Sequence, residues 1–93
     1  MSVKEKVLKV KGQTEPKKLA GSIMHTLDSG CVPVLSSVGP MAVSTAVKAC
    51  AVACKVFREA NRILVTTPKF ASEIVDNKEV TVIEIKVWEV VIK

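Results

Sequence analysis

Two adjacent lysines, Lys17 and Lys18, follow Pro16 at the point where the sequence predicts the first turn of a helix. Cations are mildly unfavourable there, because the positive end of the helix dipole and the unpaired N–H groups of the first turn lie close by. An anion between the lysines and those N–H groups would explain their placement, whereas the alternative is an ordinary solvated lysine pair. We predict that Lys17 and Lys18 contact phosphate.

A second group of cations lies within and just after the longest helical segment. This segment runs from Met41 to Glu59 without an internal glycine or proline. At about 100° per residue these cations fall opposite a predicted buried face of small and aromatic side chains. They would extend a phosphate-binding surface, although Glu59 lies among them and a charged outer helix face is commonly only solvated. The cations are Lys48, Lys55, Arg58 and Arg62.

The Gly39-Pro40 pair directly precedes this segment. It does not make a phosphate-binding loop, because neither a glycine-rich run nor a Lys-Ser/Thr pair follows it. What the pair can provide is the start of a helix whose unpaired N–H groups face an anion. Gly39 and Pro40 are therefore included in the predicted phosphate-binding surface.

Thiols and one imidazole are the remaining candidates for chemistry. Cys50 and Cys54 are one helical turn apart, but they lack a second pair to complete the four ligands of zinc. We interpret them, like Cys31, as buried structural thiols. His25 has no serine or cysteine partner in a nucleophile setting, and Asp28 is only its helical neighbour. We predict no catalytic residue, no metal and no cofactor, and hence a protein that is not an enzyme.

Composition limits the remaining choices. The 93 residues are predicted to make one domain, 1–93, because so short a chain cannot sustain two cores, and 48% hydrophobic residues are ample for one. Fourteen Lys and Arg against nine Asp and Glu give a net charge of +5, which favours an anionic partner without identifying it. Two phenylalanines and one tryptophan are too few for a base-stacking platform, so recognition would be of backbone charge and shape.

The cellular setting follows from the cysteines and the apolar runs. An odd number of cysteines in apolar surroundings, without a signal-peptide segment at the N-terminus, indicates a reducing cytosol. The longest apolar runs, such as Ala49 to Cys54, are too short to span a bilayer. We expect a cytoplasmic protein, or one associated with a nucleoid or nucleus, and no membrane partner.

Strand and helix signals alternate around the candidate residues. The stretch from Glu5 to Lys11 alternates as a first strand. The helix after it is expected to have Thr14 as its N-cap, Pro16 in its first turn and Gly30 as its stop. These signals place the two lysines at the entrance of the first helix.

A short apolar run from Val32 to Val38 predicts a buried second strand, whose Pro33 places its start near an edge or a bulge. After the long helix, β-branched residues predict two more strands joined by a turn at Asp76-Asn77-Lys78. The alternation changes phase at Trp88 and Glu89, which a bulge would explain. The order βαβαββ predicts an α/β (α+β) fold, a two-layer sandwich with a four-stranded mixed sheet and two helices on one face.

Four stretches together follow the pattern of one family. The most specific is 39–49, GPMAVSTAVKA, in which a glycine precedes a helix that opens with Ala-Val-x-x-Ala-Val-Lys. The others are 16–23 (PKKLAGSI), 68–70 (PKF) and 79–81 (EVT). In this order they resemble the stage V sporulation protein S (SpoVS) family over nearly the whole chain.

That family is similar in turn to the Alba superfamily, whose members are dimeric chromatin-associated or RNA-associated proteins. The resemblance implies an Alba-like fold with phosphate contacts at the start of the first helix, a glycine-containing loop beside them, and an extended hairpin arm. The resemblance assigns these phosphate contacts to Lys17, Lys18 and Lys48. The loop lacks the arginine common in Alba, and the hairpin tip from Asp76 to Glu79 is not basic, so an arm in a DNA groove is not expected.

These observations lead to one hypothesis and one alternative. The hypothesis is a homodimer or higher homo-oligomer that binds DNA or RNA through phosphates, with weak sequence specificity and strong salt dependence. The alternative is a regulatory, sporulation-type protein–protein module that makes no contact with nucleic acid. The apolar stretch around Trp88, with Val87, Val90 and Val91, is either core or an edge that pairs with another copy.

Overall fold

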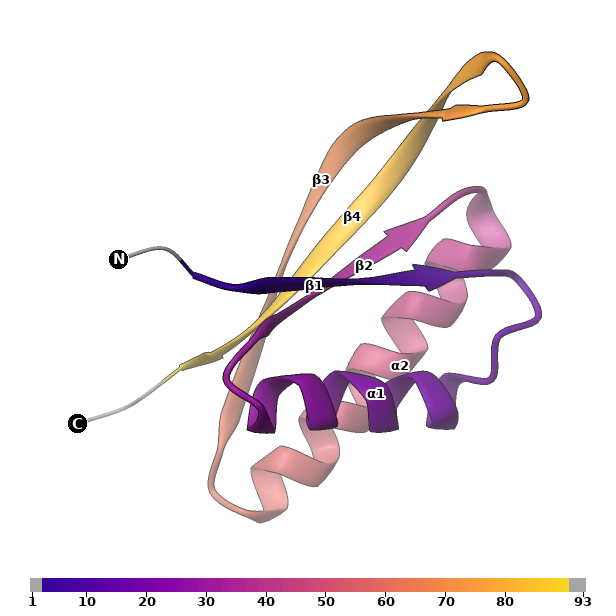
Figure 1. Cartoon of the computed structure of the whole chain (residues 1–93). Coiled ribbons are helices and arrows are strands. Elements are labelled where there is room, and N and C mark those ends of the chain that lie inside the picture. Colours follow the sequence, from indigo (N-terminus) through magenta and orange to yellow (C-terminus); the bar gives the residue numbers. More distant parts are fainter. Residues whose placement is uncertain (1–2, 91–93) are drawn as a thin grey trace.

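The computed structural model describes residues 3–90, which form two helices and four strands in the predicted order βαβαββ (Figure 1). In chain order the elements are β1 (Glu5–Val10), α1 (Pro16–Asp28), β2 (Val32–Ser37), α2 (Pro40–Glu59), β3 (Ile63–Val75) and β4 (Lys78–Val90).

The four strands form one mixed sheet in the order β1-β2-β4-β3. β1 pairs with β2 in parallel, and β4 pairs antiparallel with both β2 and β3. The register sets Leu35 of β2 beside Leu8 of β1 and Ile85 of β4, so these side chains share one face. Residues of both helices share the hydrophobic core with this face. The predicted Alba-like α+β sandwich is confirmed.

α1 begins where the sequence predicts it but is capped differently. Pro16 occupies the first position, where a missing N–H is not needed, and Glu15 rather than Thr14 is the N-cap residue. The Thr14 hydroxyl instead accepts a hydrogen bond of 3.0 Å from the Lys11 N–H and closes the turn between β1 and α1. The predicted capping role of Thr14 is therefore wrong. Gly30, with φ of +86°, ends the helix as predicted.

α2 lies close to the sheet because its inner face is built of small side chains. It also approaches the loop after β1, where a Cβ added to Gly12 would lie 3.2 Å from the Met41 Cβ. The Thr45 hydroxyl donates a hydrogen bond of 3.4 Å to the Gly12 carbonyl. The loop that leads into α1 is thus held against the first turns of α2. The alanines of the inner face are Ala42, Ala46, Ala49 and Ala53.

By length and composition alone α2 could cross a membrane, although one side of it is buried against the rest of the fold. Seven of its residues are buried, and its exposed side carries Lys48, Lys55, Arg58 and Glu59. The core helix of a globular protein passes the same test of length and composition.

Pro33 is the second residue of β2, which is a central strand, so its predicted place near an edge or bulge is wrong. The antiparallel ladder with β4 begins one residue later, where Val34 lies opposite Lys86. The N–H that proline lacks is therefore not needed for a ladder hydrogen bond.

β3 and β4 form a long hairpin whose end projects beyond the helices (Figure 1). Its turn contains Asp76 with φ of +50° and Asn77 with φ of +62°. Two successive residues with positive φ are typical of a type I′ turn, a conformation that Asp and Asn adopt more readily than most residues. The turn predicted at this position is confirmed.

No bulge interrupts β4, because residues 63–75 pair with 78–90 in one unbroken register. The change of phase arises because Glu89 faces the helices and binds Arg62, while Trp88 on the other face donates to the Thr67 hydroxyl at 2.8 Å. Val87 is fully buried and belongs to the core. The ladder with β2 ends at Lys86, so residues 87–90 pair only with β3 among the described strands, and pairing of this stretch with another copy remains a prediction. Val91 lies outside the described residues.

Candidate nucleic-acid interface

The start of α1 and the middle of α2 share a hollow of about 410 Å³ that is lined by both Lys17 and Lys48. Pro16 and Val52 add apolar surface to it, and Glu15 adds one carboxylate. Neither lysine forms an ion pair within residues 3–90. Two lysines that are far apart in the sequence are therefore brought to one place with their charges available.

Backbone donors lie at the same end of α1. The first hydrogen bond of the helix runs from the Leu19 N–H to the Glu15 carbonyl at 3.0 Å, so the N–H groups of Lys17 and Lys18 precede the helical ladder. Glu15 provides no side-chain cap for them. An anion at this end would meet N–H donors and the positive pole of the helix dipole together with the lysine charge.

Lys18 is less available than Lys17. Its ammonium lies 3.5 Å from the Glu15 carboxylate, in an exposed i, i+3 pair. Exposed pairs of this kind are worth about 0–1 kcal/mol, so an incoming phosphate competes with Glu15 without a large penalty.

Lys55 and Arg58 continue the positive charge along the outer side of α2. They line a second hollow, of about 360 Å³, together with Cys54 and Glu59. Lys48 and Lys55 are about two helical turns apart and so lie on the same side of α2, and Arg58 is roughly 15 Å from Lys48 along the axis. We call Lys17, Lys48, Lys55 and Arg58 the cation stripe.

Gly39 and Pro40 lie at the start of α2 and line neither of these hollows. Gly39 has φ of +86° and makes the sharp entry into the helix, and Pro40 occupies a position in the first turn. Lys48 lies roughly 12 Å further along the helix axis. The pair therefore shapes the helix start, and its predicted contact with phosphate remains a prediction.

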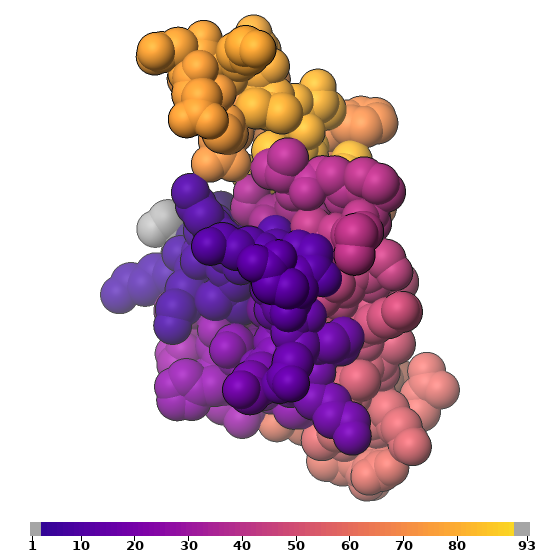
Figure 2. Space-filling model, turned by 90° about the vertical axis from the view of Figure 1, so that its right-hand side faces the viewer, coloured from indigo at the N-terminus to yellow at the C-terminus, as the bar shows by residue number. Residues whose placement is uncertain are grey.

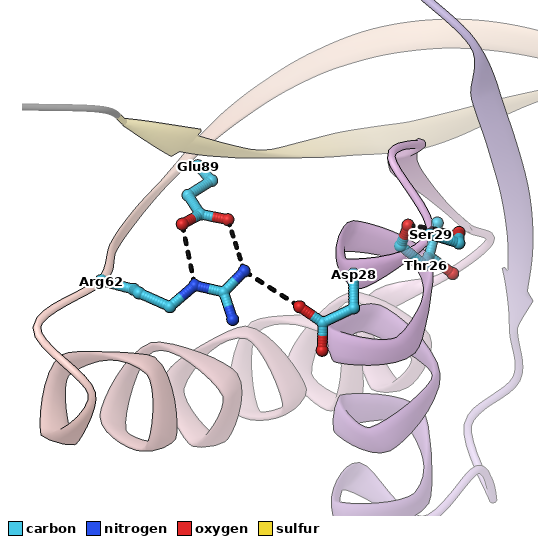
Figure 3. Close-up of polar contacts among 5 residues, drawn as sticks. All are labelled: Thr26, Asp28, Ser29, Arg62 and Glu89. Carbon is cyan, nitrogen blue, oxygen red and sulfur yellow. Dashed lines mark hydrogen bonds and ion pairs between the residues drawn. The ribbon is translucent and has the colours of Figure 1, made fainter.

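Arg62 does not join the stripe, contrary to the sequence interpretation. Its Nε and Nη2 donate to the Glu89 carboxylate at 2.8 and 2.7 Å, and Nη2 also donates to Asp28 at 3.0 Å (Figure 3). Its guanidinium carbon lies 4.0 Å from the centre of the Phe57 ring. We call these contacts the Arg62 clasp, which joins the end of α1, the start of β3 and the end of β4.

The clasp changes the acid–base behaviour of its members. Hydrogen bonding from Arg62 lowers the pKa of Glu89, and hydrogen bonds to Glu89 and then Asp28 raise the pKa of Arg62. Nearby, the Ser29 hydroxyl donates to the Thr26 carbonyl at 2.7 Å and closes the last turn of α1 (Figure 3). Arg62 is therefore a structural cation, and it is not available to a polyanion.

The family of the chain follows from a comparison with known protein families. The model of the Stage V sporulation protein S (SpoVS) family matches residues 6–90. The chain belongs to this family. Membership makes it a sporulation-related regulatory protein, and the observed fold is consistent with the Alba-like superfamily. No curated protein matches the chain significantly.

On the face of the sheet that points away from the helices in this SpoVS-family protein, lysines and carboxylates form ion pairs with one another. Lys9 pairs with Glu73, Lys69 with Glu84, and Lys86 with Glu5, at 3.1, 3.6 and 2.6 Å. Three positive and three negative charges leave this face without a net charge from these residues. Unpaired positive charge is thus concentrated on the helix layer and on the first strand.

The thiols and the imidazole of the SpoVS-family chain are dispersed. Cys50 is buried, and burial, followed by the neighbouring Cys54, raises the pKa of its thiol to about 11. Cys31 and Cys54 are half-buried, and His25 is exposed in the last turn of α1. A thiol with so high a pKa is mostly protonated and unreactive at neutral pH.

Sequence reasoning missed two contributors to the hollow between the helices. Glu15 lines it and pairs with Lys18, and Val52 lines it from α2. The i, i+3 spacing of Glu15 and Lys18 was the available signal for the first. Val52 gave no such signal, because an apolar residue at this spacing is equally typical of the core.

Proposed function

We propose that this chain binds nucleic acid, DNA or RNA, through phosphates and with weak sequence specificity. The observation that carries the proposal is the cation stripe, in which Lys17 of α1 and Lys48 of α2 share one hollow and two further cations follow along α2. None of the four is paired with a carboxylate within residues 3–90. The protein would act in the cytoplasm, or associated with a nucleoid or a nucleus.

The kind of recognition follows from the side chains near the stripe. Phe57 is buried beneath Arg62, and Trp88 lies in β4 with its N–H bonded to Thr67. Neither ring stands beside the stripe as a surface on which a base could stack. Lysine contacts with phosphate carry no sequence information, and they release counterions when they form. Weak specificity and strong salt dependence are the consequences.

The test compares two double variants that remove the same charge from different faces. Lys17→Ala with Lys48→Ala empties the hollow of cations, and Lys69→Ala with Lys86→Ala removes paired lysines of the open sheet face. Binding is measured by fluorescence anisotropy with duplex DNA, single-stranded DNA and RNA over a range of salt concentrations. For the first variant we expect weaker binding and a loss of roughly 0.7–0.9 from the salt slope for each contact removed.

The control variant should bind as the parent does, because its lysines already face carboxylates. Equal binding by the parent and the Lys17, Lys48 variant at low salt would contradict the proposed site. Equal weakening in both variants would point to net charge alone. Adding Lys18→Ala to the first variant tests whether the Glu15 pair keeps Lys18 out of the contact.

We further propose that the chain acts as a homo-oligomer. Support comes from large apolar side chains that the described chain leaves exposed, above all Phe70 at 78%, Met41 at 70% and Ile74 at 69%. Apolar side chains that cluster on a protein surface are commonly covered by another protein. Light scattering coupled to size-exclusion chromatography, on protein freed of nucleic acid, tests this directly.

The same exposed side chains favour one alternative, a regulatory protein–protein module without nucleic-acid contact. Phe70 and Ile74 lie on β3, away from the cation stripe. This alternative predicts a stable assembly and no salt-dependent shift with any oligonucleotide. The anisotropy series above therefore separates the two functions.

A further inference from the structure

The end of the hairpin, residues 70–83, carries apolar side chains that the rest of the described chain does not cover. We call these residues the arm. Phe70 and Ile74 are 78% and 69% exposed, and since they lie four residues apart on one strand they point to the same face. In the space-filling view the tip of the arm projects beyond the rest of the molecule (Figure 2). A surface of this kind favours contact with another protein.

The arm is acidic on a molecule whose net charge is +5. It holds three carboxylates and one lysine, and Glu73 is paired with Lys9 of the same chain. Asp76 and Glu79, at the tip, form no ion pair within residues 3–90. Phosphate would be repelled there, so the arm is unsuited to nucleic acid. The partner that it fits is a basic protein surface with apolar side chains of its own.

β1 and the residues before it provide such a surface. Val3 and Val7 are 57% and 58% exposed, and Lys4 and Lys6 beside them form no ion pair within the described chain. β1 is also an edge strand, whose outer backbone groups no described strand pairs. Lysines on an edge disfavour pairing with the same edge of another copy, whereas an acidic strand meets them with opposite charge.

We propose that the arm of one copy docks on β1 of a second copy. The inference rests on the self-association proposed above and specifies where the copies meet. The arm tip and the N-terminal end of β1 lie at opposite ends of the molecule (Figure 1), so the contact is head-to-tail. Head-to-tail contacts produce a ring or an open filament instead of a two-fold dimer. Each copy keeps its cation stripe outside the contact, so an assembly binds one polyanion through several stripes at once.

The test is sedimentation velocity of nuclease-treated protein at low and high salt, with two variants. Lys4→Glu with Lys6→Glu reverses the charge of the first strand. Asp76→Asn with Glu79→Lys reverses the charge of the tip and keeps at position 76 a residue that tolerates positive φ. We expect the parent to assemble at low salt, and each variant alone to sediment as a monomer. High salt should dissociate the parent, because it screens exposed charges.

An equimolar mixture of the two variants is expected to assemble again, because each arm then meets a first strand of opposite charge. Ile74→Ser, which changes no charge, should weaken assembly at low salt, because it removes apolar contact area. Circular dichroism verifies that every variant is folded.

Three results would overturn the inference. Assembly of both charge variants as in the parent, or a mixture that stays monomeric, would locate the contact elsewhere and leave self-association standing. A parent that is monomeric at every salt concentration would remove self-association as well. Nucleic-acid binding is decided separately, by the titrations with the Lys17, Lys48 variant.

Discussion

Arg58 and Arg62 lie four residues apart in the sequence and are used in opposite ways. Arg58 is exposed on the outer side of α2, where no described carboxylate pairs with it. Arg62, just after α2, is held by Glu89 and Asp28 and lies over the Phe57 ring. The difference comes from what the fold places opposite each guanidinium. Charge counted in a sequence therefore does not measure the charge that a partner can reach.

The largest loss of stability is expected from a substitution at the place where the Arg62 clasp meets the core. Phe57 is 4% exposed and supports the Arg62 guanidinium, so Phe57→Ala both leaves a cavity and removes the ring under the cation. Substitutions of this kind typically reduce the free energy of unfolding by about 3–5 kcal/mol. Chemical denaturation measures the loss. Arg58→Ala is the control and should stay within roughly 0.5 kcal/mol of the parent; a similar loss in both variants would erase the distinction between the two regions.

Replacing each of the two arginines by alanine in turn sharpens the comparison further. Arg62→Ala leaves Glu89 and Asp28 without their cation and should lower the melting temperature by several degrees, with nucleic-acid affinity changed little. Arg58→Ala should weaken nucleic-acid binding and leave the melting temperature unchanged. Thermal unfolding and anisotropy are measured on both variants, and each variant should change only one of the two quantities. Equal changes of melting temperature and affinity in both variants would mean that both arginines serve the same purpose.

Acid should weaken the clasp in a predictable direction. The pKa of Glu89 is lowered in the folded protein, chiefly by hydrogen bonds from Arg62. A carboxylate with a depressed folded pKa contributes stability that is present above its unfolded pKa, about 4.3, and is lost as the pH falls through the folded value. The melting temperature of the parent should therefore fall more steeply in acid than that of Arg62→Ala. If the melting temperature falls equally with pH in both proteins, Arg62 does not affect the titration of Glu89.

The smallest effect on stability is expected at a buried polar group that has no partner, in contrast to the paired groups of the Arg62 clasp. Ser37 is fully buried at the end of β2, and its hydroxyl has no hydrogen-bond partner among the residues that the structure describes. Removing such a group relieves a desolvation penalty, so Ser37→Ala should be neutral or stabilise the fold by up to about 1 kcal/mol. Denaturant titration checks this, with Ser36→Ala on the opposite face as control. A clear loss of stability would reveal an unrecognised hydrogen bond.

The order of elements was accessible from the sequence because local chemistry marks most of their limits. Gly30 and Gly39 adopt positive φ, Pro16 begins α1, and the Asp76-Asn77 pair forms the hairpin turn. The small-residue face of α2 and the alternation in β4 indicated which side of each element is buried. These signals act within a few residues of one another, so they can be read without knowing the fold.

Long-range partners were not accessible in this way. Arg62 finds Asp28 and Glu89 at sequence separations of 34 and 27 residues, and neither carboxylate has a local pattern that points to it. The same ion pair produced the change of phase that suggested a bulge in β4. Pro33 suggested an edge because the sequence does not state where a neighbouring ladder starts. Of the predicted cations, Lys17 and Lys48 share a hollow because α1 and α2 pack together, which helical spacing alone could not indicate.

The buried thiol of Cys50 lies within the helix that carries most of the stripe. A thiol-specific reagent such as a maleimide can modify it only while α2 is lifted from the sheet, so its labelling rate follows the opening equilibrium of that layer. The half-buried Cys31, between α1 and β2, should react sooner and act as an internal reference for the same sample, whereas Cys54 lines a hollow of the stripe itself. A bound polyanion that bridges α1 and α2 would slow the labelling of Cys50 relative to Cys31, which makes occupancy of the stripe measurable as a delay in alkylation.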